Sequence, residues 1–256
     1  MNNNVEIYPV NNSIMSDAID RIVVKLRAAN QRDGSKVFLC TGAGADGGTT
    51  TTAINIAIAL ADAGYRTLFL DCDLRKAQRY KRVEQNETSA LADYLKGEVA
   101  PYQRIINNTN VRNLDYILSG EKRDNPIRLL STQLMEDLMN HLKEDYDYVI
   151  VDTPPITITN DAEILVPMAD KYMFVVCLND TTKKELVSSR LQLVDYEDKY
   201  IGIVANKMEL GQYRDEYRDY DYFSRNNLLK KQMRGLGKKK EADKKREKGR
   251  KKEDND

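Results

Sequence analysis

A glycine- and threonine-rich segment is the first part of the chain whose residue types could do chemistry. Residues 42–52 read "GAGADGGTTTT" and stand between an apolar run, "KVFLC", and a helix-like segment, "AINIAIALADAG". A strand, a glycine loop and a helix in this order place backbone N–H groups where they can hold phosphate oxygens. Gly42, Gly47 and Thr49 match the phosphate-binding pattern G-x-x-x-x-G-K-[ST]. Gly48 stands where that pattern has lysine.

This departure leaves two interpretations of the glycine loop. Gly47 and Gly48 would let the main chain approach a phosphate closely, and the Thr49 hydroxyl could bind Mg²⁺. Without the lysine, however, no ammonium group of the loop reaches the β- and γ-phosphates. The segment therefore predicts either a nucleotide site made of backbone amides and a divalent ion, or a turn with a purely structural role.

Acidic residues follow two other apolar runs. Asp71 and Asp73, in "LFLDCDLR", have the period-two spacing that places side chains on one face of an extended chain. Two carboxylates there can orient Mg²⁺ directly or through water. Asp152 ends "YDYVIVD", a usual place for a metal-orienting or basic carboxylate. Arg75 and Lys76 would add positive charge. The alternative for each acid is a helix cap or a turn.

The apolar runs and helical patterns of the chain predict the strands and helices that position these residues. Six apolar runs read as strands, at residues 37–41, 67–71, 114–118, 148–152, 173–178 and 201–206, with helical patterns at 50–63, 126–144 and 182–196. Strands that are apolar throughout and separated by helices favour an α/β fold, with a mostly parallel sheet covered on both faces. Ligands of such sheets bind at the carboxyl ends of the strands, where the glycine loop and the acids fall.

Composition divides the chain of 256 residues into parts. We expect an N-terminal segment with a helix at 1–30, one folded domain at 31–210, a tyrosine cluster at 211–223 and a basic low-complexity tail at 224–256. The tail carries a formal charge of +8 and the rest of the chain −8. A basic tail can be solvated or can contact an anionic membrane surface. Acids interleaved with its lysines argue against both membrane contact and nucleic-acid binding, and favour a solvated tail.

Cysteine usage and the N-terminus indicate a cytoplasmic protein. Cys40, Cys72 and Cys177 lie inside apolar runs and read as core residues in a reducing compartment. His141, the only histidine, has no pattern of ligands around it that would make a zinc site. The sequence has neither a signal-peptide pattern nor an apolar run that approaches the ~20 residues of a membrane span.

Longer blocks of the sequence resemble the bacterial tyrosine kinases (BY-kinases) of capsular and exopolysaccharide biosynthesis. They read "TGAGADGGTTTTAINIAIALADAGYRTLFLDCDLRKAQ", "LDYILSG" and "NPIRLLSTQLMEDLMNHLKEDYDYVIVDTPPITITNDAEIL". The tyrosine cluster stands in the expected place after them. The resemblance is to the stand-alone cytoplasmic kinase subunit and implies a P-loop NTPase-like fold that uses ATP and Mg²⁺.

The resemblance also implies roles for individual positions. Asp71 and Asp73 match the family's second acidic motif, and Asp152 its Walker B aspartate, which implies catalytic and metal-binding roles, with Asp71 as the acceptor of the tyrosine proton. Thr49 matches the Mg²⁺-binding hydroxyl. The nucleotide-binding residues implied by the Walker A match are Gly42, Gly44, Asp46, Gly47, Gly48, Thr49 and Thr50.

Beyond the domain, the family phosphorylates tail tyrosines on a neighbouring copy. The matching acceptors here are Tyr213, Tyr217, Tyr220 and Tyr222. The family's kinase subunit works with a membrane chain-length regulator whose cytoplasmic tail activates it. This partner would bring the chain to the inner face of the membrane.

Two departures from the family bear on activity and assembly. Gly48 replaces the Walker A lysine, and losing a cation from such a site costs on the order of 10²–10³ in rate. The family's ring-forming E-x-x-R-x-x-R spacing is also absent, since Val24 and Arg21 stand three and six residues before Arg27. Two hypotheses follow: an autokinase in which Arg75, Lys76 or a partner's side chain replaces the lost cation, or a pseudokinase scaffold in the same pathway.

Overall fold

The computed structural model describes residues 4–7, 13–75, 83–85, 89–121 and 125–208. Residues 1–207 form one compact unit, and a second unit begins at Met208, almost all of it outside the described residues. The predicted tyrosine cluster and basic tail fall in that second unit, so their boundaries stay predictions.

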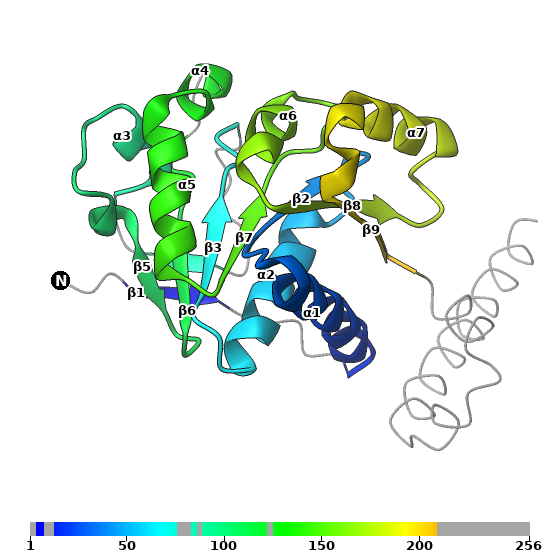
Figure 1. Cartoon of the computed structure of the whole chain (residues 1–256), viewed down its shortest axis with the longest axis horizontal. Coiled ribbons are helices and arrows are strands. Elements are labelled where there is room, and N and C mark those ends of the chain that lie inside the picture. Colours follow the sequence, from blue (N-terminus) through cyan, green and yellow to red (C-terminus); the bar gives the residue numbers. More distant parts are fainter. Residues whose placement is uncertain (1–3, 8–12, 76–82, 86–88, 122–124, 209–256) are drawn as a thin grey trace, which may run out of the picture. The chain divides into compact units, whose positions relative to one another are not determined.

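Within the described residues one sheet of nine strands carries the fold (Figure 1). The strands are β1 (Asn4–Ile7), β2 (Val37–Gly42), β3 (Thr67–Asp71), β4 (Val83–Gln85), β5 (Asn107–Thr109), β6 (Leu114–Ile117), β7 (Tyr148–Asp152), β8 (Lys171–Cys177) and β9 (Tyr200–Asn206). The α-helices are α1 (Ser13–Asp33), α2 (Thr49–Asp62), α3 (Leu91–Leu95), α4 (Pro126–Leu130), α5 (Gln133–Asp145), α6 (Asp161–Leu165) and α7 (Lys183–Gln192). Short 3-10 helices are η1 (Tyr102–Ile105), η2 (Val166–Met168) and η3 (Val194–Lys199).

The sheet is mostly parallel, as the sequence predicts. The strand order is β4-β1-β5-β6-β3-β7-β2-β8-β9, and every neighbouring pair from β6 to β9 is parallel. Antiparallel pairs occur only toward the other edge of the described sheet, between β1 and β4 and between β5 and β6. The six predicted strands are β2, β3, β6, β7, β8 and β9. Three short strands were not predicted, because segments such as "NNT" carry no apolar pattern.

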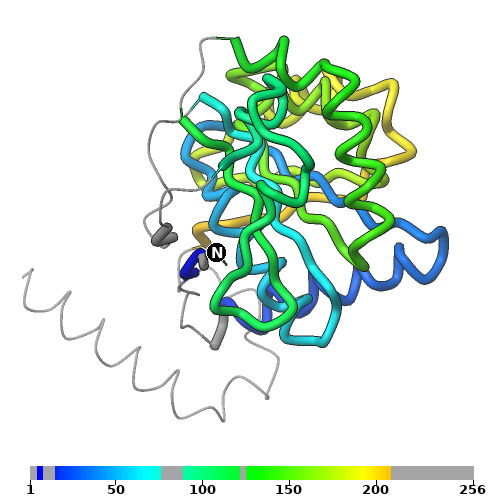
Figure 2. Tube along the Cα trace, turned by 90° about the vertical axis from the view of Figure 1, so that its left-hand side faces the viewer, coloured from blue at the N-terminus to red at the C-terminus, as the bar shows by residue number. Residues whose placement is uncertain are grey.

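Alternate side chains of the central strands β2, β3, β7 and β8 enter two separate cores. In β2, Phe38 and Cys40 pack with the helices α1 and α2, while Val37 and Leu39 pack with α5 and α6. Figures 1 and 2 both show α1, in dark blue, and α7, in yellow, on opposite sides of the sheet. All three cysteines are buried and unbonded to one another, which confirms their assignment to the core.

The prediction of one helix at 126–144 is wrong in one respect, because this segment forms two helices, α4 and α5. Ser131 and Thr132 separate α4 from α5, and Thr132 is extended (φ −84°, ψ 155°). Their hydroxyls donate to the carbonyls of Ile127 and Leu129, both at 2.8 Å. Such side-chain bonds compete with the helical pattern and end α4. Likewise, the predicted helix at 182–196 ends at Gln192 and continues as η3.

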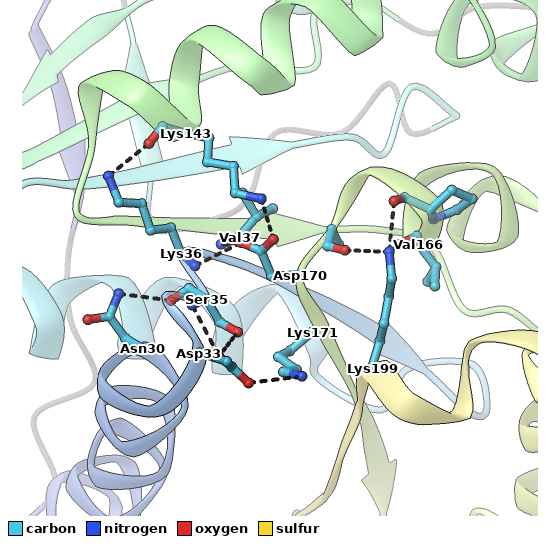
Figure 3. A network of polar contacts seen from close by, with 12 residues as sticks. Asn30, Asp33, Ser35, Lys36, Val37, Lys143, Val166, Asp170, Lys171 and Lys199 are labelled. Atoms are coloured by element: carbon cyan, nitrogen blue, oxygen red, sulfur yellow. Dashed lines mark hydrogen bonds and ion pairs between the residues drawn. The ribbon is translucent and has the colours of Figure 1, made fainter.

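Asp170 fixes the start of β2 against the start of β8, at the edge where the parallel strands begin (Figure 3). Its Oδ2 accepts the N–H groups of Lys36 and Val37 at 2.8 and 2.9 Å, and the Lys143 ammonium contacts Oδ1. Burial raises the pKa of Asp170, but the hydrogen bonds from Lys143, Val37 and Lys36 together lower it below its ordinary value of 3.8. Ionised Asp170 therefore stabilises the folded chain.

We predict that Asp170→Asn lowers the free energy of unfolding at pH 7 by about 1.5–3 kcal/mol, the range for hydrogen bonds to charged groups. A carboxylate with a lowered folded pKa stabilises above its unfolded pKa and loses this effect as the pH falls through the folded value. The difference between variant and wild type should therefore shrink below pH 4. Urea unfolding at pH 7, 5 and 3.5 measures it, with exposed Glu144→Gln as the control. Equal stability of variant and wild type at pH 7 would contradict the prediction.

Candidate functional site

Three adjacent strands bring the sequence-predicted site residues to one edge of the sheet. β7 lies between β3 and β2, and its last residue, Asp152, is in register with Asp71 of β3 and Cys40 of β2. Two residues beyond Cys40, β2 ends at Gly42 and the chain enters the glycine loop. The loop and two of the three predicted acids thus converge where the parallel strands end, as expected for such sheets.

The glycine loop presents backbone amides at the start of α2. This helix begins at Thr49, with Gly48 as its N-cap, and the Thr52 N–H donates to the Gly48 carbonyl at 3.0 Å. N–H groups in the first turn of a helix have no intrahelical acceptor. Among the hydrogen bonds between described residues, none uses an N–H of residues 44–48 as donor. A row of amide donors is therefore available to an anion.

Tight packing makes two loop glycines necessary. A Cβ on Gly42 would lie 3.0 Å from the carbonyl oxygen of Gly44 and 3.1 Å from the Thr49 hydroxyl oxygen. A Cβ on Gly47 would lie 3.3 Å from the carbonyl oxygen of Val175 in β8. The loop is folded closely over the strand end, with the Thr49 hydroxyl beside it. This cradle, with its amide donors, fits a phosphate group of a nucleotide.

Position 48 lacks the lysine of the pattern, and its backbone and surroundings also favour glycine. Its backbone is left-handed (φ +80°), a conformation that L side chains adopt at a cost. A Cβ there would lie 2.4 Å from the Nδ2 atom of Asn206. That amide group donates to the Gly47 carbonyl at 2.9 Å. A side chain at position 48 must therefore displace Asn206.

Sequence reasoning missed the contribution of Asn206 and Lys207. The Lys207 ammonium donates to the carbonyl of Asp46 at 2.5 Å. Both residues directly follow the apolar part of the last predicted strand, so they belong to the same carboxyl-end edge as the other site residues. Their position at the end of a predicted strand could have marked them as candidate site residues.

Two of the predicted acids, Asp71 and Asp73, accept hydrogen bonds within the turn after β3, and Asp71 also accepts one from Ser119. Asp71 is half-buried, and its carboxylate accepts the Ser119 hydroxyl at 3.0 Å and the Asp73 N–H at 2.9 Å. This second bond is an Asx turn that follows β3. Asp73 is buried and accepts the Arg75 N–H at 3.2 Å. Asp152 is 1% exposed. Hydrogen bonds thus position Asp71 and Asp73, and the strand register and burial position Asp152.

These acids do not form a cation site by themselves. In the described part of the chain, no group of three or more His, Cys, Asp or Glu residues is placed to hold a metal ion. Mg²⁺ commonly binds one or two carboxylates and takes its remaining oxygens from water and phosphates. A site completed by the nucleotide and the Thr49 hydroxyl fits this arrangement.

Arg75 forms an ion pair with Asp161, a residue that sequence reasoning did not single out. The Arg75 Nε and Nη2 atoms donate to the two carboxylate oxygens of Asp161 at 2.8 and 2.7 Å. Asp161 is fully buried and begins α6, and its hydrogen bond raises the pKa of Arg75. The pair ties the segment after β3 to α6, so this guanidinium is engaged by protein. Lys76, the other predicted cation, lies outside the described residues.

The cysteines near the acids stay protonated. Burial raises the pKa of the Cys40 and Cys72 thiols, and the nearby carboxylates of Asp152 and Asp71 raise it further. Because the thiolate is the form that binds metals and attacks electrophiles, a raised pKa disfavours both reactions at Cys40 and Cys72.

Some predicted residues cannot be placed. Tyr213, Tyr217, Tyr220, Tyr222 and the basic tail lie outside the described residues. Within the described part, every helix is too short or too polar to cross a membrane.

Comparison with known proteins identifies the family. Residues 43–179, from the glycine loop to beyond Asp152, match the family described as AAA domain. The chain is 33% identical over 179 residues to tyrosine-protein kinase CpsD of Streptococcus pneumoniae, covering 70% of this chain and 78% of that protein.

Solved structures agree in fold. The chimerical protein CapA2B2 superposes with a TM-score of 0.72 at 25% identity, over 81% of this chain and 94% of that one. The kinase domain of Escherichia coli tyrosine kinase ETK superposes with a TM-score of 0.69 at 25% identity, over 76% and 77%. These matches confirm the P-loop NTPase-like fold and the resemblance that the sequence blocks carry. The chain belongs to the bacterial tyrosine-kinase family.

Proposed function

We propose that the chain is an ATP-dependent protein-tyrosine autokinase that regulates capsular or exopolysaccharide biosynthesis. The observation that carries the proposal is the row of amide donors in the glycine loop, set at the same sheet edge as Asp71 and Asp152. Family membership supports the reaction, since the relatives are named tyrosine-protein kinases.

The loop residues would hold the phosphates. The amides of residues 44–48 and of the first turn of α2 would donate to phosphate oxygens, and Thr49, Asp152 and Asp73 would orient Mg²⁺. When bound, Mg²⁺ supplies charge neutralisation between the β- and γ-phosphates. Asp71 would orient the incoming tyrosine hydroxyl.

The reaction transfers one phosphoryl group. The phenolic oxygen bonds to the γ-phosphorus as the bond from that phosphorus to the β–γ bridging oxygen breaks, and ADP leaves with that oxygen. The phenolic proton passes to the Asp71 carboxylate. The proposed acceptors are Tyr213, Tyr217, Tyr220 and Tyr222 of a neighbouring copy.

The partner proposed from the family is a membrane chain-length regulator of polysaccharide assembly. Its cytoplasmic tail would activate the kinase and bring it to the inner face of the membrane. The basic tail at 224–256 would add attraction to anionic lipids, at about 1 kcal/mol per basic residue near the surface.

A pseudokinase is the second candidate, and Gly48 favours it. The loop lacks the lysine, its backbone at this position is left-handed, and the Asn206 side chain occupies the space that a Cβ at position 48 would take. In this case the chain would bind nucleotide or accept phosphate from another kinase, as a scaffold in the same pathway.

The kinase proposal predicts that purified protein incubated with Mg·ATP acquires phosphotyrosine on its tail. Asp71→Asn should reduce the initial rate by roughly 10²-fold or more, the usual range for a catalytic acid or base. Phosphotyrosine immunoblotting and mass spectrometry of the tail measure it. Asp62→Asn, exposed at the end of α2, serves as the control. Wild-type protein without phosphotyrosine would reject the autokinase in favour of the pseudokinase.

Arg75 is predicted to support the structure without binding phosphate. Arg75→Lys keeps the charge but loses the planar fork, so buried Asp161 loses one of its two hydrogen bonds. We expect the free energy of unfolding to fall by about 1–3 kcal/mol, with Mg·ATP affinity within threefold of wild type. Exposed Arg128→Lys should change neither quantity. Unchanged stability with a tenfold loss of affinity would instead make Arg75 a phosphate ligand.

Substitution at Gly48 should cost more than its left-handed backbone alone explains. Gly64 also has a positive φ (+93°), but no atom lies within 4 Å of its Cβ position. We therefore expect Gly48→Ala to cost about 1 kcal/mol more than Gly64→Ala, the contribution of the displaced Asn206–Gly47 hydrogen bond. In an Asn206→Ala background the excess should vanish. Denaturant unfolding of the four variants decides it, and equal costs for both glycines would show that Asn206 does not constrain position 48.

A further inference from the structure

The end of β9 contacts the glycine loop through two consecutive side chains. The Asn206 side-chain amide donates to the Gly47 carbonyl at 2.9 Å, and the Lys207 ammonium donates to the Asp46 carbonyl at 2.5 Å. These contacts join residues about 160 positions apart in the chain. Residues 206 and 207 are therefore part of the surroundings of the loop.

A left-handed residue makes this double contact possible. Consecutive side chains of an extended strand point to opposite faces of the sheet. Lys207 leaves the strand with φ +57°, which is uncommon for a residue other than glycine. With this turn, the side chains of Asn206 and Lys207 both reach the loop. The strained backbone is compensated by two hydrogen bonds to adjacent loop carbonyls.

The loop needs positive charge, and Lys207 supplies it. Phosphoryl transfer depends on neutralising charge on the transferred group, and Gly48 provides none. Arg75 is engaged by the buried carboxylate of Asp161. The Lys207 ammonium lies against Asp46, two residues before Gly48, in the loop whose amide donors face no protein acceptor among the described residues. Of its three N–H donors, the contact with the Asp46 carbonyl uses one.

We propose that Lys207 supplies, from the end of β9, the cation for the β- and γ-phosphates of a nucleotide in the glycine loop. This inference rests on the proposed nucleotide-binding function and names the residue that replaces the Walker A lysine. Lys207 is exposed and has a flexible four-carbon stem, so its ammonium can turn from the Asp46 carbonyl toward a phosphate. Gly48 leaves room for Asn206, and Asn206 holds the end of β9 against the loop.

The test measures nucleotide affinity, separately from catalysis. Mg·ATP, Mg·ADP and AMP are titrated by calorimetry into wild-type protein, Lys207→Met, Lys207→Arg and the control Lys25→Met. The control removes one exposed charge on α1, and thermal unfolding of each variant checks the fold. For Lys207→Met we expect about a tenfold weaker affinity for Mg·ATP, the lower end for a hydrogen bond to a charged group. AMP affinity should stay within twofold, and Lys207→Arg should bind Mg·ATP within threefold of wild type.

Each contrary result has a separate meaning. If wild-type protein binds Mg·ATP and Lys207→Met binds it within twofold of wild type, the role of Lys207 is overturned while the proposed function stands. An equal loss of affinity for AMP and ATP would also overturn it, because Lys207 would then only shape the loop. If wild-type protein shows no Mg·ATP binding at millimolar concentration, the proposed function itself fails.

Discussion

The site depends on one constraint: the glycine loop has amide donors that find no acceptor among the described residues. Backbone N–H groups are strong donors, and burying them without partners is costly. Between described residues, no hydrogen bond uses the N–H groups of residues 44–48. The tight packing around Gly42 and Gly47 leaves the loop little freedom to satisfy them internally. An anion at the N-terminus of α2 would accept from these N–H groups, of which those of Gly44 and Gly47 belong to buried residues and those of Ala45 and Asp46 to exposed ones.

The rest of the edge is held by protein contacts that leave the loop open. Arg75 is engaged by Asp161, and Asp71 is held by Ser119 and by the N–H of Asp73. The first two contacts join the segment at the end of β3 to α6 and to the segment after β6, and the third lies within the turn after β3. In the proposed site, positive charge comes from Lys207, the residue that directly follows β9. In this arrangement the cation and the loop follow different strands, β9 and β2, so the charge is supplied from outside the loop.

Much of this arrangement was predictable, because apolar runs and carboxyl-end polar clusters depend on local sequence. The strand ends at Asp71 and Asp152 and the glycine loop after β2 follow directly from that pattern. The break between α4 and α5 at Ser131 and Thr132 does not follow from that pattern. The hydroxyl hydrogen bonds that end α4 compete there with a strong helical pattern. The contacts of Asn206 and Lys207 with the glycine loop could not be predicted for another reason. They depend on the left-handed backbone of Lys207 and on the order of the strands in the sheet.

The most direct measurement is the NMR response of the loop amides to nucleotide. Backbone amide resonances of residues 44–48 would be followed in ¹⁵N-labelled protein during titration with Mg·ADP, which gives no turnover. Bound phosphate oxygens should move these resonances strongly and slow the exchange of their protons with water. Amides on the exposed side of α1 should stay unchanged. Loop resonances that remain in place at millimolar Mg·ADP would contradict the account.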